Sequence, residues 1–157
     1  MKRIVLLLLI VSLCLCGCSN KDADVATYTH EDLTIQLPVG FVDLSDQEVA
    51  QGVTFMYGMD PIAVNGLREE KAAFQAYGLD LDVERYGQLL IASNNVSTQL
   101  EERDGITTFT YTSGDFTYVV TLWENDDALW LVQAYCLTAD YAQVKNDIWD
   151  ILSSVTV

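Results

Sequence analysis

The sequence predicts an α/β (α+β) fold, in which a mostly antiparallel sheet is flanked by helices on both of its faces. Several runs alternate apolar and polar residues, as strands do, and short turns rich in Gly, Asn and Asp join most of them as hairpins. Two other segments repeat apolar residues with the period of a helix. The chain has 157 residues, of which 50% are hydrophobic, and this length suits one domain.

The charge balance limits the classes of partner. Lys and Arg together number 8 against 23 Asp and Glu, which gives a formal net charge of -15. A protein that binds nucleic acid needs a basic surface to neutralise phosphates. The composition therefore excludes nucleic acid as a partner.

The first 17 residues have the layout of a secretory signal peptide. Two basic residues precede an apolar run over residues 4–15, which is shorter than the roughly 20 residues that span a bilayer. The run ends in Leu-Cys-Gly-Cys at residues 15–18, which resembles the lipobox of bacterial lipoproteins. The resemblance implies cleavage after Gly17, a diacylglyceryl group on Cys18, and anchorage in the cell membrane facing outside the cytoplasm. In the alternative, Cys18 belongs to an ordinary signal peptide or to an uncleaved anchor.

Cleavage at that point changes both the cysteine count and the charge. The two earlier cysteines leave with the signal and Cys18 is lipidated, so Cys136 alone stays free and no intrachain disulfide forms. Six basic residues then remain against 23 acidic ones, which makes the formal charge -17. We expect residues 18–26 to be the lipidated cysteine and a flexible tether, and residues 27–157 to be a single globular domain.

The first half of the domain contains a strand and a hairpin. Apolar residues alternate with polar ones over residues 33–37, and a Pro and a Gly then end the pattern. Two further runs, residues 53–57 and 62–67, flank a turn and predict a hairpin. Residues 68–77 have a helix-favouring composition but also suit an extension of the preceding strand.

A helix is expected to begin after Asp82 and to end at Asn94. Asp82 is a favourable N-cap residue, and Leu81 and Tyr86 have the spacing of a hydrophobic staple. Gly87 lies inside this helix, where Gly costs about 1 kcal/mol relative to Ala.

The rest of the chain predicts a four-stranded meander and a closing helix. Asp-Gly, Gly-Asp and Asn-Asp-Asp turns separate the strands. The last two strands are uncharged on both faces along most of their length, which is typical of strands covered on both sides. Thr138 is expected to cap the closing helix. The predicted strands are residues 99–102, 106–112, 116–124 and 128–137, with a short terminal strand at residues 155–157.

The order of these elements resembles the PsbP-like α/β/α sandwich. The resemblance rests on Leu-Thr-Ile-Gln-Leu-Pro-Val-Gly-Phe at residues 33–41, on the meander over residues 104–136, and on the closing helix with its final Val-Thr-Val. It covers residues 28–157. The superfamily includes photosystem II extrinsic proteins, a Ran-binding import factor and many small bacterial lipoproteins. The resemblance implies a fold and a small bacterial lipoprotein, and it carries no functional residue onto this chain.

His30 and Cys136 are the candidate reactive side chains. His30 is the single histidine, whereas a catalytic dyad or a zinc site needs further His or Cys partners, so we expect an exposed polar residue at the start of a strand. Cys136 lies in an apolar run without a basic neighbour to activate its thiol. We expect it to be a small buried hydrophobe.

Clustered carboxylates suggest a calcium site as an alternative. Asp80, Asp82 and Glu84 alternate, but Arg85 and Ile91 stand where a calcium-binding EF-hand loop has Gly and Glu, so helix capping explains the three better. Two acidic loops that meet in space would still hold Ca²⁺, and this alternative stays open. The other acidic loops are Asn125, Asp126 and Asp127, and Asp43, Asp46 and Glu48.

The aromatic residues have two interpretations. Trp123, Trp130, Trp149 and the many tyrosines either fill the core or line a groove for a sugar or a peptide. Their strand and helix period favours the core.

The sequence contains no nucleophile elbow, phosphate-binding loop or zinc-protease motif, so we assign no catalytic residue, no metal ligand and no cofactor. We expect a lipid-anchored extracytoplasmic lipoprotein that is a non-enzymatic binding or accessory module at the cell envelope. Its partners are then the membrane, through Cys18, and an unknown envelope protein or ligand. The alternative is a calcium-dependent or small-ligand-binding envelope protein.

Overall fold

The computed structural model describes residues 24–50 and 52–157. Cys18, the signal segment and most of the predicted tether lie outside the described residues. A seven-stranded sheet, antiparallel throughout, forms the centre in the order β3-β4-β5-β9-β8-β7-β6. Its strands are β3 (Val42–Asp43), β4 (Phe55–Met59), β5 (Ile62–Glu70), β6 (Glu101–Arg103), β7 (Ile106–Ser113), β8 (Phe116–Glu124) and β9 (Ala128–Leu137).

The predicted strand at residues 33–37 is confirmed, but it pairs outside the main sheet. It is β2 (Leu33–Pro38), which forms a separate hairpin with β1 (Val25–His30). The sequence placed Val25 and Ala26 in the tether, and this boundary is wrong. Every second residue of β1 turns toward the core opposite an apolar residue of β2, as Ala26 does opposite Leu37, so the segment gains burial by pairing.

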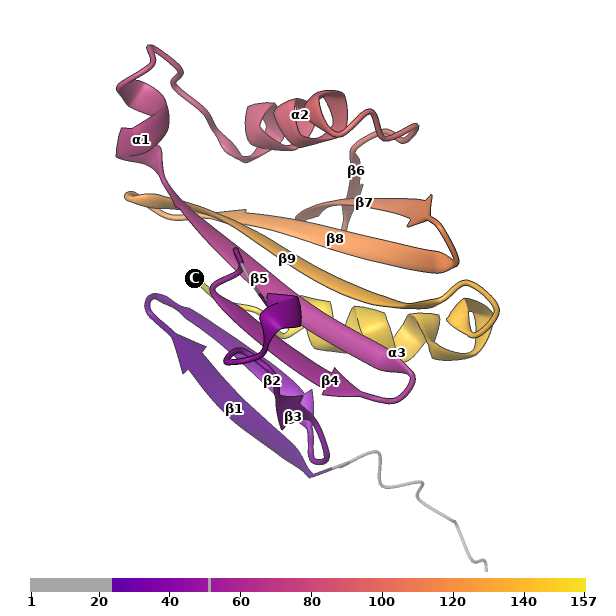
Figure 1. Ribbon diagram of the computed structural model, residues 1–157. Coiled ribbons are helices and arrows are strands. Elements are labelled where there is room, and N and C mark those ends of the chain that lie inside the picture. Colours follow the sequence, from indigo (N-terminus) through magenta and orange to yellow (C-terminus); the bar gives the residue numbers. More distant parts are fainter. Residues whose placement is uncertain (1–23, 51) are drawn as a thin grey trace, which may run out of the picture.

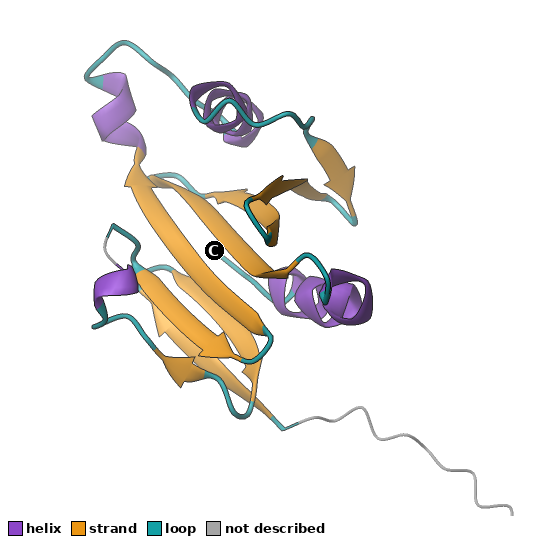
Figure 2. Ribbon diagram, turned by 45° about the vertical axis from the view of Figure 1, so that its right-hand side comes forward, coloured by secondary structure: helices purple, strands orange, loops and turns teal. Residues whose placement is uncertain are grey.

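The main sheet carries a helix on each face, so the predicted fold class is confirmed. Figure 1 shows α2 (Val83–Ser93) and α3 (Tyr141–Ser153) on opposite sides of β8 and β9. The β1–β2 hairpin shares the α3 face, and the view in Figure 2 separates this layer from α2. Among the described residues, no helix combines the length and apolar character that crossing a membrane requires.

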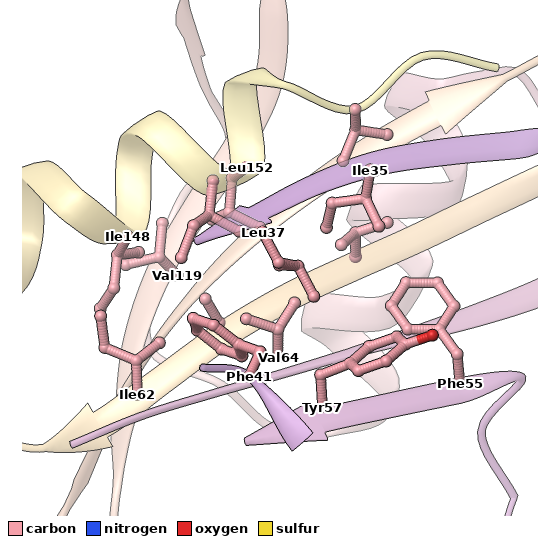
Figure 3. Close-up of a cluster of buried hydrophobic side chains, with 14 of the residues drawn as sticks. Ile35, Leu37, Phe41, Phe55, Tyr57, Ile62, Val64, Val119, Ile148 and Leu152 are labelled. Carbon is pink, nitrogen blue, oxygen red and sulfur yellow. The ribbon is translucent and has the colours of Figure 1, made fainter. Parts of the chain in front are cut away.

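The larger part of the core lies on the α3 face. Leu33, Ile35 and Leu37 of β2 are fully buried there against the inner faces of β4, β5, β8 and β9 and against α3. Figure 3 shows Ile35 and Leu37 between labelled side chains of the sheet and of α3. Burial of such residues contributes roughly 1.5–3 kcal/mol per large side chain, so the hairpin is part of the core and not an appendage.

The helix at residues 82–94 is confirmed in its start and its end. Asp82 Oδ1 accepts a hydrogen bond from the backbone N–H of Arg85 over 2.8 Å, and Asn94 is the C-cap. The O–H of the buried Tyr86 donates to Glu69 of β5, which fixes α2 over the sheet. Close packing explains the glycine at position 87, because a Cβ there would lie 2.6 Å from Cδ1 of Leu122.

The structure resolves the alternatives for residues 68–77 and shifts several predicted bounds, among them those of the first hairpin, which is β4 and β5, and of the strand expected at residues 99–102, which is β6. Residues 68–77 follow both alternatives, because β5 continues to Glu70 and α1 (Lys71–Gln75) follows it. Thr138 does not cap the last helix: its hydroxyl pairs with that of Thr117 over 3.0 Å, and α3 begins after Asp140. The terminal strand is reduced to a bridge between Thr156 and Thr34. A short 3₁₀ helix, η1 (Glu48–Ala50), completes the described elements.

Candidate functional site

The α2 face of the sheet is only partly covered. Tyr86 of α2 packs over Val120 and Leu122 of β8 and over Leu129 of β9. The helix has 11 residues and is about 16 Å long, whereas the 9 residues of β8 span about 30 Å. The far part of the face therefore lacks a helical cover, and Phe116 at the end of β8 is 38% exposed.

Three tyrosines cross this uncovered part side by side. Tyr111 of β7, Tyr118 of β8 and Tyr135 of β9 are direct cross-strand neighbours, and all three are half-buried. The rings of Tyr111 and Tyr118 stack with centroids 4.8 Å apart and planes at 7°, and those of Tyr118 and Tyr135 lie 5.0 Å apart at 28°. We call these three residues the tyrosine row. It presents aromatic surface across three paired strands of the sheet.

A cavity of about 240 Å³ lies between the tyrosine row and the body of α2. Leu90 and Asn94 close it at the C-terminal end of the helix, and its floor includes Phe109 and Val120. A second, outer hollow of about 650 Å³ adjoins it and runs over Tyr118 and the loop at residues 94–97. The two share Asn94, Val96, Tyr111 and Gln133, so they form one continuous groove, with an inner cavity and an outer hollow.

Asn65 gives the inner cavity its specific polar group. It lies in the middle of β5, only 8% exposed, opposite Gln133 of β9, and both side chains line the cavity. Among the residues that the structure describes, nothing donates a hydrogen bond to Asn65 Oδ1. A buried acceptor without a partner costs about 1–3 kcal/mol. The side-chain amide of Asn65 lines the inner cavity, whereas Oδ1 itself is closed off from water, so a bound molecule reaches this acceptor when the amide turns toward the cavity.

The groove is electrically neutral. No Asp, Glu, Lys or Arg lines either of its parts. Burial raises the pKa of Tyr111 and of Tyr135, and the adjacent Tyr118 raises both further. Both phenols therefore keep their protons at neutral pH, and Tyr111, which lines both parts of the groove, can donate a hydrogen bond there, whereas Tyr135 lies beside the groove. The groove offers amides, phenols and apolar surface, which suit non-covalent binding of an uncharged molecule.

A separate hollow, unconnected with the groove, lies on the α3 face of the protein. Its volume is about 500 Å³, between the β1–β2 hairpin and the end of α3, and Phe41, Met59, Asp147 and Asp150 line it. None of its lining residues holds a buried polar atom without a partner, as far as the described part of the chain shows. The groove on the α2 face is therefore the better candidate.

His30 is not the exposed residue that the sequence predicted. It ends β1, half-buried, with its ring stacked on Phe55 at a centroid distance of 4.4 Å. Its Nε2 lies 3.0 Å from the hydroxyl of Tyr57. The difference arises because β1 folds back onto the core. The predicted burial of Cys136 is confirmed, since it is 1% exposed and burial raises the pKa of its thiol.

In each predicted acidic segment one side chain serves a turn or a helix cap. Asp43 Oδ1 accepts from the backbone N–H of Ser45, and Asn125 Oδ1 accepts from those of Asp127 and Ala128. Asp82 caps α2, as described above. Within residues 24–50 and 52–157, no three His, Cys, Asp or Glu side chains stand close enough to hold a metal ion. The structure brings none of the predicted acidic loops into the groove.

The tryptophans follow the predicted core interpretation. Trp130 is fully buried and Trp149 is 7% exposed, while Trp123 is half-buried and packs against the core of the α3 face. The guanidinium of Arg103 lies 3.9 Å from the ring centroid of Trp149, which ties the β6–β7 turn to α3. The groove interpretation instead fits the tyrosine row.

No family model matches the chain, and no curated protein sequence matches it. The solved structures that are similar in fold include the following two. The solution structure of cyanobacterial PsbP (CyanoP) from Synechocystis sp. PCC 6803 superposes with a TM-score of 0.58 at 14% sequence identity, over 91% of this chain and 98% of that one. The fold is PsbP-like. A mutant of the protein Mog1 gives a TM-score of 0.51 at 11% identity, over 85% of this chain and 96% of its own. At these identities the likeness concerns the fold alone.

The sequence did contain a signal for the groove. Asn65 interrupts the apolar run of β5, and Gln133 interrupts that of β9. Amides in the middle of two such strands indicate a polar contact on a buried face. What no pattern along one strand reveals is that these two residues are paired neighbours on adjacent strands.

Proposed function

We propose that this protein is a lipid-anchored binding protein without enzymatic activity, which faces outside the cytoplasm and holds its ligand in the groove. The observation that carries the binding role is the uncovered tyrosine row beside a cavity that holds the unpartnered Asn65. The anchor rests on the lipobox-like residues 15–18. Both features fit a protein that works by holding a molecule close to a membrane.

The position of the anchor fits this role. Six residues separate Cys18 from Val25, where β1 begins. Even fully extended, this stretch spans only about 25 Å. A lipid on Cys18 thus keeps the domain within one domain diameter of the bilayer surface.

The charges restrict how the domain and its ligand associate. After cleavage the chain carries a formal charge of -17, which repels anionic lipid headgroups. Attachment to the membrane then depends on the acyl chains and not on the domain surface. Anionic molecules are repelled as well, and the uncharged groove favours a neutral ligand.

No described histidine, cysteine, carboxylate or lysine lines the groove, so the Ser and Thr hydroxyls of the outer hollow have no base beside them to activate them. The single histidine and the free Cys136 both pack in the core of the α3 face, away from the groove. Amides and protonated phenols orient a ligand but do not act as nucleophiles or general bases at neutral pH. We therefore propose binding without turnover.

Photo-crosslinking in the cells that naturally produce the protein tests this proposal. Tyr118 is replaced with benzoylphenylalanine, and the matched control carries the same group at Tyr77, which is 86% exposed outside the groove. We expect a discrete crosslinked product from position 118 and none of that mass from position 77. Identical products from both positions, or none from position 118, would contradict binding in the groove.

A further inference from the structure

We infer that the inner cavity binds a neutral aromatic ring that carries one N–H or O–H donor, and that the donor bonds to Asn65 Oδ1. The inference rests on the proposed function and names the chemical class of its ligand. It draws on the size of the inner cavity, the unpartnered acceptor, and the continuity with the tyrosine row.

The size of the cavity suits one ring system. A cavity of about 150 Å³ lined by Leu, Ile and Phe is large enough to bind benzene. The inner cavity measures about 240 Å³, which leaves room for a fused or substituted ring. Leu67, Phe109, Val120 and Leu131 offer apolar contacts to its faces.

The polar group at the cavity selects for a donor. Asn65 Oδ1 is buried and receives no hydrogen bond from any described residue, so an incoming N–H or O–H group relieves its desolvation when the side-chain amide turns this oxygen toward the cavity. A ligand without a donor buries this oxygen further and leaves it unpaired. The expected preference is therefore for a ring with a donor over the same ring without one.

The outer hollow gives a larger ligand room to extend beyond the inner cavity. Tyr111 lines both parts of the groove and stacks on Tyr118, so it connects the inner cavity to the tyrosine row. Asn95 and Ser97 add polar contacts in the outer hollow. A molecule whose ring occupies the inner cavity can thus lay a neutral, flat or amide-rich remainder over the tyrosines.

Indole and indene form a matched pair of probes. Indene has the shape of indole but a CH₂ group in place of the N–H. The mature protein, which carries its lipid on Cys18 and labelled Leu and Val methyl groups, is placed in nanodiscs, and each probe is titrated by NMR. We expect indole to shift the methyl signals of Leu67, Val120 and Leu131 and to bind about tenfold more tightly than indene.

The variant Asn65→Leu removes the acceptor while keeping the volume similar. Because Oδ1 is unpaired in the free protein, we expect the variant to fold, to lose the preference for indole, and to bind indene at least as well as the native protein does. Any uptake of the probes by the lipid is the same for both proteins. Equal affinities of native protein for indole and indene, or no shift of the cavity methyls, would overturn the inference.

A second variant keeps the test decisive if Asn65→Leu fails to fold. Val96 is half-buried and lines both parts of the groove, so Val96→Phe is expected to fill the passage and to abolish binding of both probes. Unchanged binding of indole to Val96→Phe would also overturn the inference. A crosslink at Tyr118 without indole binding would reject this ligand class but leave the proposed binding function standing, so the two failures are distinguishable.

Discussion

The indole Nε1 of Trp130 donates a hydrogen bond over 2.9 Å to Oδ1 of Asp32, which joins the β1–β2 turn to the centre of the main sheet. Asn125 and Arg68 donate to the same carboxylate over 2.6 and 3.2 Å. Burial by itself raises the pKa of Asp32, but the hydrogen bonds from Asn125, Arg68 and Trp130 outweigh it and lower the pKa to about 2. The hairpin is therefore held by a charged group as well as by apolar packing.

Replacing Asp32 with Asn should weaken the fold. The neutral amide has one acceptor oxygen where the carboxylate has two, so donors on Trp130 or Arg68 lose their partner. We expect a loss of about 1–3 kcal/mol in the free energy of unfolding at pH 7, measured by urea denaturation. Asp46→Asn, a change in an exposed loop, is the matched control and should have little effect.

The pH dependence of the free energy of unfolding in acid provides a second check on Asp32. Its pKa falls from 3.8 to about 2 on folding, so the unfolded chain binds the proton more readily, and the stabilisation is lost as the pH falls through that range. The difference between native protein and Asp32→Asn should shrink accordingly below pH 4. A variant as stable as the native protein at pH 7 would show that the carboxylate does not hold the hairpin.

His30 should make the fold sensitive to mild acid. Burial lowers its pKa, an effect that Asp43 opposes more weakly, so the unfolded chain binds a proton more readily than the native chain below pH 6.5. Stability is then lost as the pH falls from 6.5 toward the folded pKa. We expect the native protein to lose more stability between pH 7.5 and 5 than His30→Gln does, as measured by urea midpoints. An equal loss in both proteins contradicts the buried position of this ring.

Gly87 should resist the substitution that usually stabilises a helix. Ala is favoured over Gly by about 1 kcal/mol inside helices. At position 87, however, a Cβ would lie 2.6 Å from Leu122 and 2.7 Å from Leu100. We expect Gly87→Ala to destabilise the protein by about 1–3 kcal/mol in thermal or urea denaturation.

Ala92→Gly on the exposed side of the same helix provides the comparison. This change tests helix propensity alone and should lower the free energy of unfolding by about 1 kcal/mol. If Gly87→Ala instead raises the stability by a similar amount, α2 does not pack on the sheet as closely as described.

Cys18→Ala tests the proposed anchor. Without the thiol no diacylglyceryl group can be attached, so we expect the protein to leave the membrane fraction or to remain unprocessed, as judged by fractionation and mass spectrometry. Cys14→Ala, a change within the apolar run, should retain both processing and membrane attachment. Normal cleavage with full membrane retention of Cys18→Ala would reject the lipoprotein proposal.

Local signals in the sequence predicted the parts of the fold that local chemistry determines. Asp82 with its staple predicted the start of α2, and the alternation in residues 33–37 predicted a buried strand. Thr138 carried an equally good capping signal, but its hydroxyl found a partner in Thr117 on β8. A contact between residues 21 positions apart is not visible in the local pattern.

The groove was harder to predict because it depends on how far α2 extends over the sheet. The uncharged pattern of residues 116–124 and 128–137, which include Tyr118 and Tyr135, predicted strands covered on both sides. The lengths of α2 and β8 determine that the cover stops short of the tyrosine row. The position of the helix over the strands comes from long-range contacts such as that between Tyr86 and Glu69.

Hydroxyl-radical footprinting of Tyr118 tests the central claim most directly. The oxidation of Tyr118 is measured by mass spectrometry relative to that of the exposed Tyr77, once in native membranes and once in the washed, purified protein. If the groove holds a ligand at the membrane, the ratio of Tyr118 to Tyr77 oxidation falls in native membranes and recovers on purification. The same ratio in both preparations would contradict the claim that this face of the sheet is a binding site.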